Sequence, residues 1–324
     1  MILNIKTFFA LFTFIFLLTL INYCIGCILI PGPLHEAKTL IIGQKLSVTQ
    51  ISARLKNHQI INHQTPFWFI ARLYSLKSSL KSGEYIFTPQ ISGAQILKIL
   101  SEGKSIVHKL MIPEGVMVSE IIDKINSEER LLGEIKGKIP EGFLMPSTYF
   151  FSYGDQKEQI IDRMRKSMSA ALDIVMTKLP TQSPLETRLE VLTLASIIEK
   201  EAQLDEEKPI IAAVFLNRLK KGIKLQADPT SIYAITEGKF KLGRPLTKKD
   251  LLTQSPYNTY YIKNLPPGPI ACPGLKSLEA VVNPTKTNAI YFVVNGRGGH
   301  NFSDNLVEHN KNIANYKKGL SPIP

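Results

Sequence analysis

Residues 186–204 read ETRLEVLTLASIIEKEAQL, and this stretch is the centre of the expected fold. It follows a break marked by Pro180 and Pro184, and its apolar residues recur at helical spacing, which predicts one helix. Two acids, Glu199 and Glu201, lie two residues apart near its end. Each of them is either a charged residue on the protein surface or a residue with a chemical function.

Helical spacing separates these two glutamates. Residues three and four apart share a face of a helix. Glu199 then lies on a smaller and more polar face of the helix. Glu201 lies on the more apolar face, together with Ile197, Ile198 and Leu204. Burial disfavours a carboxylate and raises its pKa, so an acid on the apolar face can stay protonated and donate a proton. The spacing nominates Glu201 as the acid, while a surface glutamate paired with a nearby lysine is the alternative.

The segments around this helix indicate an α+β protein. Further helices are predicted over 46–61, 91–104, 112–125 (with Ser119 as a cap), 157–179, 208–222 and 305–318, and strands over 83–88 and 105–112. The stretches between the later helices, 224–234, 252–270, 272–287 and 288–302, read as turn-rich and polar.

The N-terminal segment differs from the rest. Thr7 to Ile30 is 24 residues without a charge, and roughly 20 apolar residues suffice to span a membrane as a helix. Lys6 precedes the segment and Pro31 ends it, so the positive-inside bias places the N-terminus in the cytoplasm and the remainder outside. A cleaved signal peptide, or a lipoprotein acylated at Cys27, are the alternatives to a retained single-pass anchor.

Charge and cysteine content narrow the class of partner. The chain of 324 residues has a net charge of +12, of which Lys6 is the only contribution from residues 1–30, so the exported part carries +11. Anionic lipid headgroups or an anionic wall polymer suit such a surface, and nucleic acid is not expected outside a membrane. Cys272 is the only cysteine beyond the apolar segment, so no disulfide is expected there, nor any metal or cofactor.

A series of motifs runs through the chain in a fixed order. They are SGEYIFTP, ASIIEKEA, FLNRL, LQADPTSIYA, SPYNTY, LPPGPI, NPTKTNAIYFV and GRGGHNFSDNLVEHN. With the N-terminal anchor, this series resembles the MltG/YceG-like endolytic murein transglycosylases over essentially the whole chain. One departure is Ser147 in EGFLMPSTY, where related sequences generally carry Asp.

The resemblance implies a layout and a reaction. It implies a cytoplasmic stub and transmembrane anchor (1–30), a small LysM-like α+β subdomain (31–108) and a mixed α+β catalytic domain (109–324) in the periplasm or outside the cell. The implied enzyme cuts nascent peptidoglycan glycan strands between N-acetylmuramic acid and N-acetylglucosamine, leaves a 1,6-anhydromuramic end and limits strand elongation. Glu201 aligns with the catalytic glutamate, and work beside the wall-synthesis machinery is suggested.

That reaction needs only one carboxyl group, in contrast to ordinary glycosidases, which use two. The polar loops supply candidate helpers. The possible supporting residues are Glu199, Gln226, Asp228, Tyr257 and Asn258, and the candidate substrate-binding residues are His300 and Asn301. An Asp-Pro turn at Asp228, a loop cap at Asn258 and a hairpin turn over 296–300 are the structural alternatives.

Two rival functions remain open from the sequence. One is a non-catalytic, membrane-anchored scaffold that binds peptidoglycan. The other is a metal-dependent hydrolase built on His300, Glu308 and His309, which is disfavoured because Glu308 and His309 are adjacent and diverge on a helix.

Overall fold

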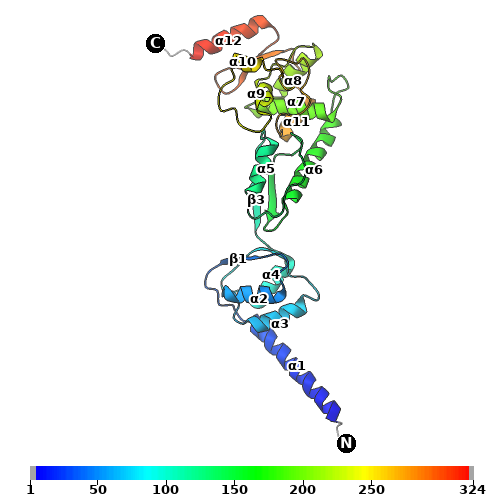
Figure 1. Ribbon diagram of the computed structural model, residues 1–324, viewed down its shortest axis with the longest axis vertical. Coiled ribbons are helices and arrows are strands. Elements are labelled where there is room, and N and C mark those ends of the chain that lie inside the picture. Colours follow the sequence, from blue (N-terminus) through cyan, green and yellow to red (C-terminus); the bar gives the residue numbers. More distant parts are fainter. Residues whose placement is uncertain (1–4, 321–324) are drawn as a thin grey trace. The chain divides into compact units, whose positions relative to one another are not determined.

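The computed structural model describes residues 5–320 (Figure 1). It divides into two compact units. The first comprises Met1–Lys109, Glu129–Leu132 and Phe150–Gln156, and the second comprises Leu110–Glu128, Gly133–Tyr149 and Lys157–Pro324. The protein is mixed α+β, as the sequence predicted.

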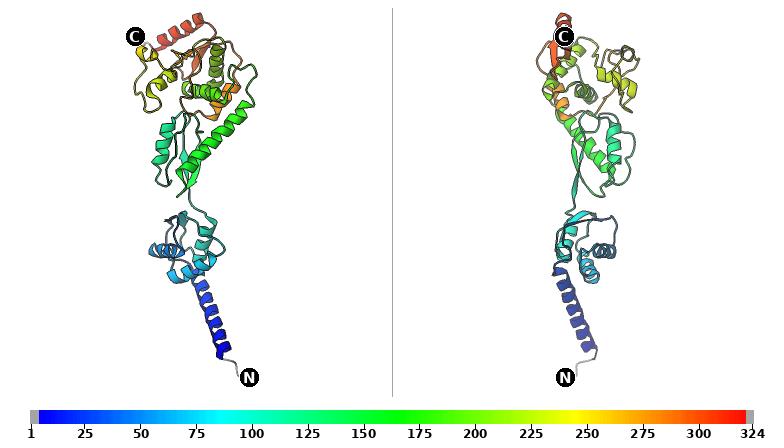
Figure 2. Two further views of the ribbon diagram at one scale, coloured as in Figure 1. Left: turned by 45° about the vertical axis from the view of Figure 1, so that its right-hand side comes forward. Right: turned by 90° about the vertical axis from the view of Figure 1, so that its left-hand side faces the viewer.

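The N-terminal helix α1 (Ile5–Leu29) is long and apolar enough, over Thr7–Leu29, to cross a membrane. Its first turns project freely in both views of Figure 2. Large apolar side chains along it are exposed, with Phe9 67% and Phe12 62% accessible, while Cys24 and Ile28 near its end are buried. A run of exposed apolar side chains of this length is costly in water and suits a lipid environment.

The first unit packs three helices against a two-stranded sheet. Strand β1 (Lys38–Ile42) pairs antiparallel with β2 (Gly83–Phe87), in a register that sets Lys38 opposite Phe87. Between and after the strands lie α2 (Val48–Asn57), α3 (Gln64–Tyr74) and α4 (Gly93–Glu102). Ser92 caps α4 and Gly103 ends it in a left-handed conformation, both as predicted. The core includes Leu55, Phe67, Tyr85 and Leu100.

The second unit is built around α7 (Arg188–Glu201). Every residue from Val191 to Ile198 is buried. Helices α6 (Lys157–Met176), α8 (Lys208–Lys220) and α11 (Leu275–Val282) pack around it, as Figure 1 shows. Because α7 is covered on all sides, its sequence lacks the polar stripe of a surface helix.

The remaining elements are short, except for the C-terminal helix. They are β3 (Val107–Met111), which pairs with β4 (Thr148–Ser152); α5 (Val118–Asn126); the 3-10 turn η1 (Asp205–Glu207); α9 (Asp228–Thr236); α10 (Lys248–Leu251); β5 (Tyr291–Val294), which forms an antiparallel hairpin with β6 (His300–Ser303); and α12 (Leu306–Leu320).

Three details correct the sequence-based expectation. The stretches 224–234 and 272–287 are not only turns, because they contain α9 and α11. Helix α5 begins one residue before Ser119, which does not cap it: the N–H groups of Met117 and Val118 donate to the carboxylates of Glu120 and Glu141, respectively. Helix α7 ends at Glu201, so Leu204 lies beyond it and is exposed.

The start of α7 is held by a reciprocal cap, which generates a stability prediction. The Thr187 hydroxyl accepts from the N–H of Glu190 at 3.2 Å, and the Glu190 carboxylate accepts from the N–H of Thr187 at 2.8 Å. We expect Thr187→Ala to lower the free energy of unfolding by about 1 kcal/mol in urea denaturation. Thr181→Ala is the control, since Thr181 is exposed and precedes the helix. Equal stability of the two variants would contradict this assignment.

Candidate active site

Glu201 is the last residue of α7 and lies where the buried helix reaches a cavity. The next residue, Ala202, is extended, and its N–H donates to the carbonyl of Ile198. The chain therefore leaves the helix directly after Glu201. The helix holds the backbone of Glu201 rigidly, while its side chain faces an open space and stays partly exposed.

This cavity measures about 210 Å³ and is formed by segments far apart in the sequence. Helix α7 supplies Glu201, α8 supplies Arg218, and the start of α9 supplies Asp228. The loops and the β5–β6 hairpin complete the wall with Leu225, Gln226, Tyr260, Phe292, Val293, Val294 and His300. Apolar side chains and a few polar groups thus surround two carboxyl groups, those of Glu201 and Asp228, as in a small saccharide or catalytic site.

The surroundings of Glu201 favour its protonated form. Burial and, to a smaller extent, the negative charge of Asp228 together raise its pKa from 4.5 to about 8. The backbone N–H of Asp228 donates to the Glu201 carboxyl group and opposes this rise in part. At neutral pH, Glu201 is therefore mostly a neutral acid with a proton to donate.

Asp228 is fixed beside Glu201 by its position and by a tyrosine. It opens α9, with Pro229 following it. The hydroxyl of Tyr260 donates to Asp228 Oδ1 at 2.7 Å. Burial and then this hydrogen bond raise the pKa of Tyr260, so the tyrosine retains its proton and Asp228 remains the acceptor.

Gln226 lines the cavity in an unusual backbone conformation. Its φ is 53°, a left-handed value that costs energy for a residue with a side chain. Its N–H donates to the carbonyl of Thr259, and its side-chain oxygen accepts from Arg218 Nη1 at 3.4 Å. Strain of this kind often accompanies functional sites, and here it directs the Gln226 side chain toward the cavity wall.

Arg218 connects the chain segments that form this wall of the cavity. Its guanidinium is buried and donates to the carbonyls of Ile290 at 2.6 Å and Leu225 at 2.7 Å, and it lies 5.3 Å from the centre of the Tyr291 ring. These bonds tie α8 to the loop before α9 and to β5. Arg218 therefore fixes the shape of the cavity more than it offers a free charge to a ligand.

His300 closes the cavity from the hairpin and is clamped by Glu207. Its Nδ1 lies 2.6 Å from Glu207 Oε2, and its backbone N–H donates to Glu207 Oε1 at 2.7 Å. His309, which the metal hypothesis pairs with His300, instead stacks on Tyr291 with ring centres 4.9 Å apart. In residues 5–320, no group of three His, Cys, Asp or Glu side chains is arranged to hold a metal.

Glu199 lies outside the cavity, in a network of its own. Its carboxylate accepts from Ser277 Oγ at 2.6 Å and from the N–H of Gly274 at 2.9 Å. Lys208 Nζ lies 3.3 Å from it, and the two side chains are only 8% and 4% exposed. Glu199 thus ties α7 to α8 and to the start of α11. Glu199 is therefore paired with a cation, whereas no ion pair engages Glu201 within residues 5–320.

The other predicted residues are not brought to the cavity wall. Asn258 is buried, and its amide donates to the carbonyls of Leu251 and Thr253, so it holds its loop together. Tyr257 packs against Tyr233, with ring centres 4.8 Å apart. Asn301 lines a different cavity, and Ser147 is exposed on the segment before β4.

Sequence reasoning missed three residues of this site: Arg218, Tyr260 and Glu207. Arg218 belongs to the FLNRL motif and Tyr260 to the SPYNTY motif, and both motifs are recognisable in the sequence. Their roles depend on distant partners, Ile290 and Asp228, that spacing along the chain does not reveal.

The chain is similar in sequence to several known proteins. The sequence profile of the YceG-like family matches residues 40–315. The endolytic murein transglycosylase of Bacillus subtilis (strain 168) is 31% identical over 302 residues, which cover 83% of this chain and 82% of that protein. The endolytic murein transglycosylase of Streptococcus pneumoniae (strain ATCC BAA-255 / R6) is 27% identical, covering 89% of this chain and 60% of the relative.

A solved structure is also similar. The crystal structure of a putative yceG-like protein from Listeria monocytogenes superposes with a TM-score of 0.52 at 34% sequence identity. The match covers 85% of this chain and 99% of that structure.

The raised pKa of Glu201 predicts a pH-dependent stability difference. Between pH 4.5 and about 8 the unfolded chain releases a proton that the folded chain keeps. The contribution of Glu201 to stability is therefore fully present below pH 4.5 and is lost as pH rises through about 8. The glutamine of Glu201→Gln does not titrate, so this variant does not lose stability in this way. The unfolding free energy of Glu201→Gln minus that of the native protein should therefore rise with pH from 4.5 to about 8 and then level off. A constant difference across a pH series of urea denaturations would contradict the assignment.

Replacement of the neighbouring glutamate, Glu199, should change the free energy of unfolding in the opposite direction. Glu199→Gln leaves buried Lys208 with Asp205 and Glu114 as its remaining acidic partners, at 2.8 and 3.6 Å. We expect the unfolding free energy at pH 7 to fall by about 1–3 kcal/mol. Glu201→Gln is the matched control, with the same chemical change two residues away. A Glu199→Gln protein as stable as the native one would show that the network contributes little.

Proposed function

The chain belongs to the YceG-like family, and from this premise we propose that it is a lytic transglycosylase that cuts the glycan strands of murein internally. The observation that carries the proposal is the single carboxyl group with a raised pKa, Glu201, in a cavity of about 210 Å³. The curated relatives named endolytic murein transglycosylase support the reaction class.

In the proposed reaction Glu201 acts first as an acid. Its proton passes to the glycosidic oxygen between N-acetylmuramic acid and N-acetylglucosamine, and the bond from the anomeric carbon to that oxygen breaks. Protonation near neutral pH requires an acid that is still neutral there, which a pKa of about 8 provides. An ordinary exposed glutamate would be ionised and unable to donate.

Glu201 then acts as a base. Now a carboxylate, it takes the proton from the 6-hydroxyl of the same muramic acid residue as that oxygen bonds to the anomeric carbon. The product is a 1,6-anhydromuramic end, and Glu201 regains its proton. The nucleophile is part of the substrate, so it is already in place, and no second catalytic carboxylate or activated water is needed.

The neighbouring groups have supporting roles in this proposal. Asp228, held by Tyr260, carries negative charge beside Glu201 and favours the positive charge that develops at the anomeric carbon. Gln226 and His300 offer polar groups at the cavity wall for N-acetyl and hydroxyl groups of the sugar. Glu199, Tyr257 and Asn258 are assigned positioning and packing roles instead.

The remaining parts of the chain fit a membrane-anchored enzyme. We place α1 across the plasma (inner) membrane with the N-terminus in the cytoplasm, and the chain that follows α1 outside. In this proposal residues 31–108 form the LysM-like subdomain and residues 109–324 form the catalytic domain. Action close to the membrane would bring the enzyme to newly made strands beside the synthesis machinery.

A digest of un-crosslinked glycan by the full-length protein in detergent tests this function. Mass spectrometry should find products whose ends are one water lighter than hydrolysed ends. Glu201→Gln should lower the rate by about 10²–10⁴-fold, the usual contribution of an acid–base group. Activity should also fall as pH rises above about 8, because the acid form is lost.

Glu199→Gln serves as the matched variant in this digest and should keep most of the activity at a temperature where it remains folded. Full activity of Glu201→Gln, together with loss in Glu199→Gln, would overturn the assignment. Binding of glycan by the native protein without any cleavage would favour the scaffold function instead.

A further inference from the structure

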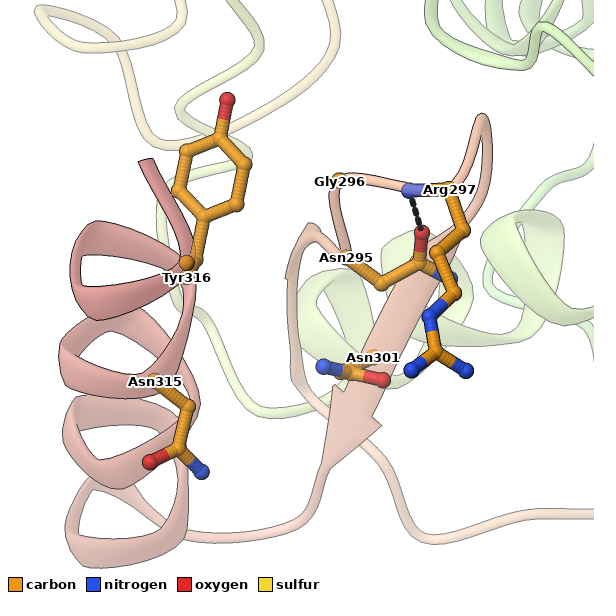
Figure 3. A pocket seen from close by; sticks show the side chains of 7 residues that line it. Asn295, Gly296, Arg297, Asn301, Asn315 and Tyr316 are labelled. Atoms are coloured by element: carbon orange, nitrogen blue, oxygen red, sulfur yellow. Dashed lines mark hydrogen bonds between the residues drawn. The ribbon is translucent and has the colours of Figure 1, made fainter. Parts of the chain in front are cut away.

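A second polar cavity, of about 560 Å³, lies between the β5–β6 turn and α12. Asn295, Arg297 and Asn301 line it from the hairpin, and Asn315 and Tyr316 line it from α12. Figure 3 shows these two groups on facing walls, with the Arg297 guanidinium and the Asn301 amide on the hairpin side. The reaction at Glu201 uses none of these residues.

The hairpin is shared by both cavities. His300 lines the Glu201 cavity, whereas Asn301, the next residue, lines the polar cavity. Val294 pairs with His300 and Val293 pairs with Asn301 in the antiparallel register. Successive side chains of a strand point to opposite faces, so His300 and Asn301 leave β6 in opposite directions, while Val293, the partner of Asn301, also lines the Glu201 cavity. The two cavities therefore share the β5–β6 hairpin as part of their walls.

The turn that carries Arg297 is held in shape before any ligand arrives. Asn295 Oδ1 accepts from the N–H groups of Arg297 at 2.8 Å and Gly299 at 3.2 Å. Gly296 has a φ of 75°, and the ring of Tyr316 lies against it, 3.6 Å from where a Cβ would stand. The Arg297 side chain is therefore presented from a braced loop, which lowers the entropy cost of binding.

The lining is rich in donors. Among residues 5–320, no carboxylate lines the cavity, and no side-chain hydrogen bond or ion pair engages Arg297, Asn301 or Asn315. A guanidinium offers a planar fork of N–H donors that matches a carboxylate in a bidentate manner. Side-chain amides both donate and accept, which suits peptide groups next to that carboxylate.

We propose that this cavity binds the carboxylate and adjoining amides of the peptide stem that muramic acid carries in murein. The inference rests on the proposed function, which supplies the murein strand. Arg297 holds the carboxylate, and Asn301 and Asn315 bind the amides. The enzyme then holds the sugar in the Glu201 cavity and the peptide in the polar cavity, and prefers glycan strands that carry peptides over bare ones.

Calorimetric titration of the full-length protein in detergent with the tripeptide L-Ala–γ-D-Glu–L-Lys tests the site. The peptide has no glycosidic bond, so binding is read without cleavage. We expect Arg297→Ala to weaken binding by at least about ten-fold, in keeping with the loss of a charge-assisted hydrogen bond. Arg297→Lys, which keeps the charge without the fork, should fall between Arg297→Ala and the native protein. Amidation of the peptide carboxylates should weaken binding as Arg297→Ala does.

Lys178→Ala is the control, because Lys178 is exposed and lies outside this cavity, and it should bind as the native protein does. No binding by the native protein, or equal binding by Arg297→Ala, would overturn the proposal. Loss of affinity for peptide-free glycan in Arg297→Ala would overturn it in favour of a saccharide site. Peptide binding by a protein that never cleaves glycan would contradict the proposed function and leave this site standing.

Discussion

The partial removal of Glu201 from water is the constraint on which the rest of the site depends. A carboxylate at the end of a buried helix is hydrated less than it is in solution, and within residues 5–320 no ion pair engages Glu201. The group therefore keeps its proton, with a pKa of about 8. The acid is created by where α7 ends and by what surrounds that end, since glutamate is an ordinary side chain elsewhere in the chain.

Much of the second unit serves to hold that point in place. Glu199 ties α7 to α8 and α11 through Lys208, Ser277 and Gly274, so the last turn of the helix cannot shift. Arg218 joins α8 to the loop before α9 and to β5. Two glutamates two residues apart thus perform opposite tasks: Glu199 accepts hydrogen bonds within a polar network that stabilises the fold, while Glu201 is left neutral at some cost to stability.

The sequence predicted the α+β class, the apolar N-terminal helix and the helix that carries Glu201, because these depend on local patterns. It predicted the burial of Glu201 for a partly wrong reason. Leu204 is beyond the helix, and the face with Glu199 is buried too, so helical spacing could not separate the two acids by exposure. They differ in their partners, which come from α8, α9 and α11.

Short elements and long-range contacts account for what spacing missed. Helices α9 and α11 have nine and eight residues and begin within proline- and glycine-rich sequence, which reads as turns. Tyr257 and Tyr260 stand in one motif, and only the fold shows that Tyr260 reaches Asp228 while Tyr257 packs against Tyr233.

The most direct test of this account is the protonation state of Glu201 itself. Difference infrared spectroscopy of the native protein against Glu201→Gln, recorded across a pH series, isolates the carboxyl group of this one residue. The account predicts a protonated carboxyl at pH 7 that titrates with a pKa near 8. An ionised carboxylate at pH 7, titrating near the ordinary value of 4.5, would contradict it.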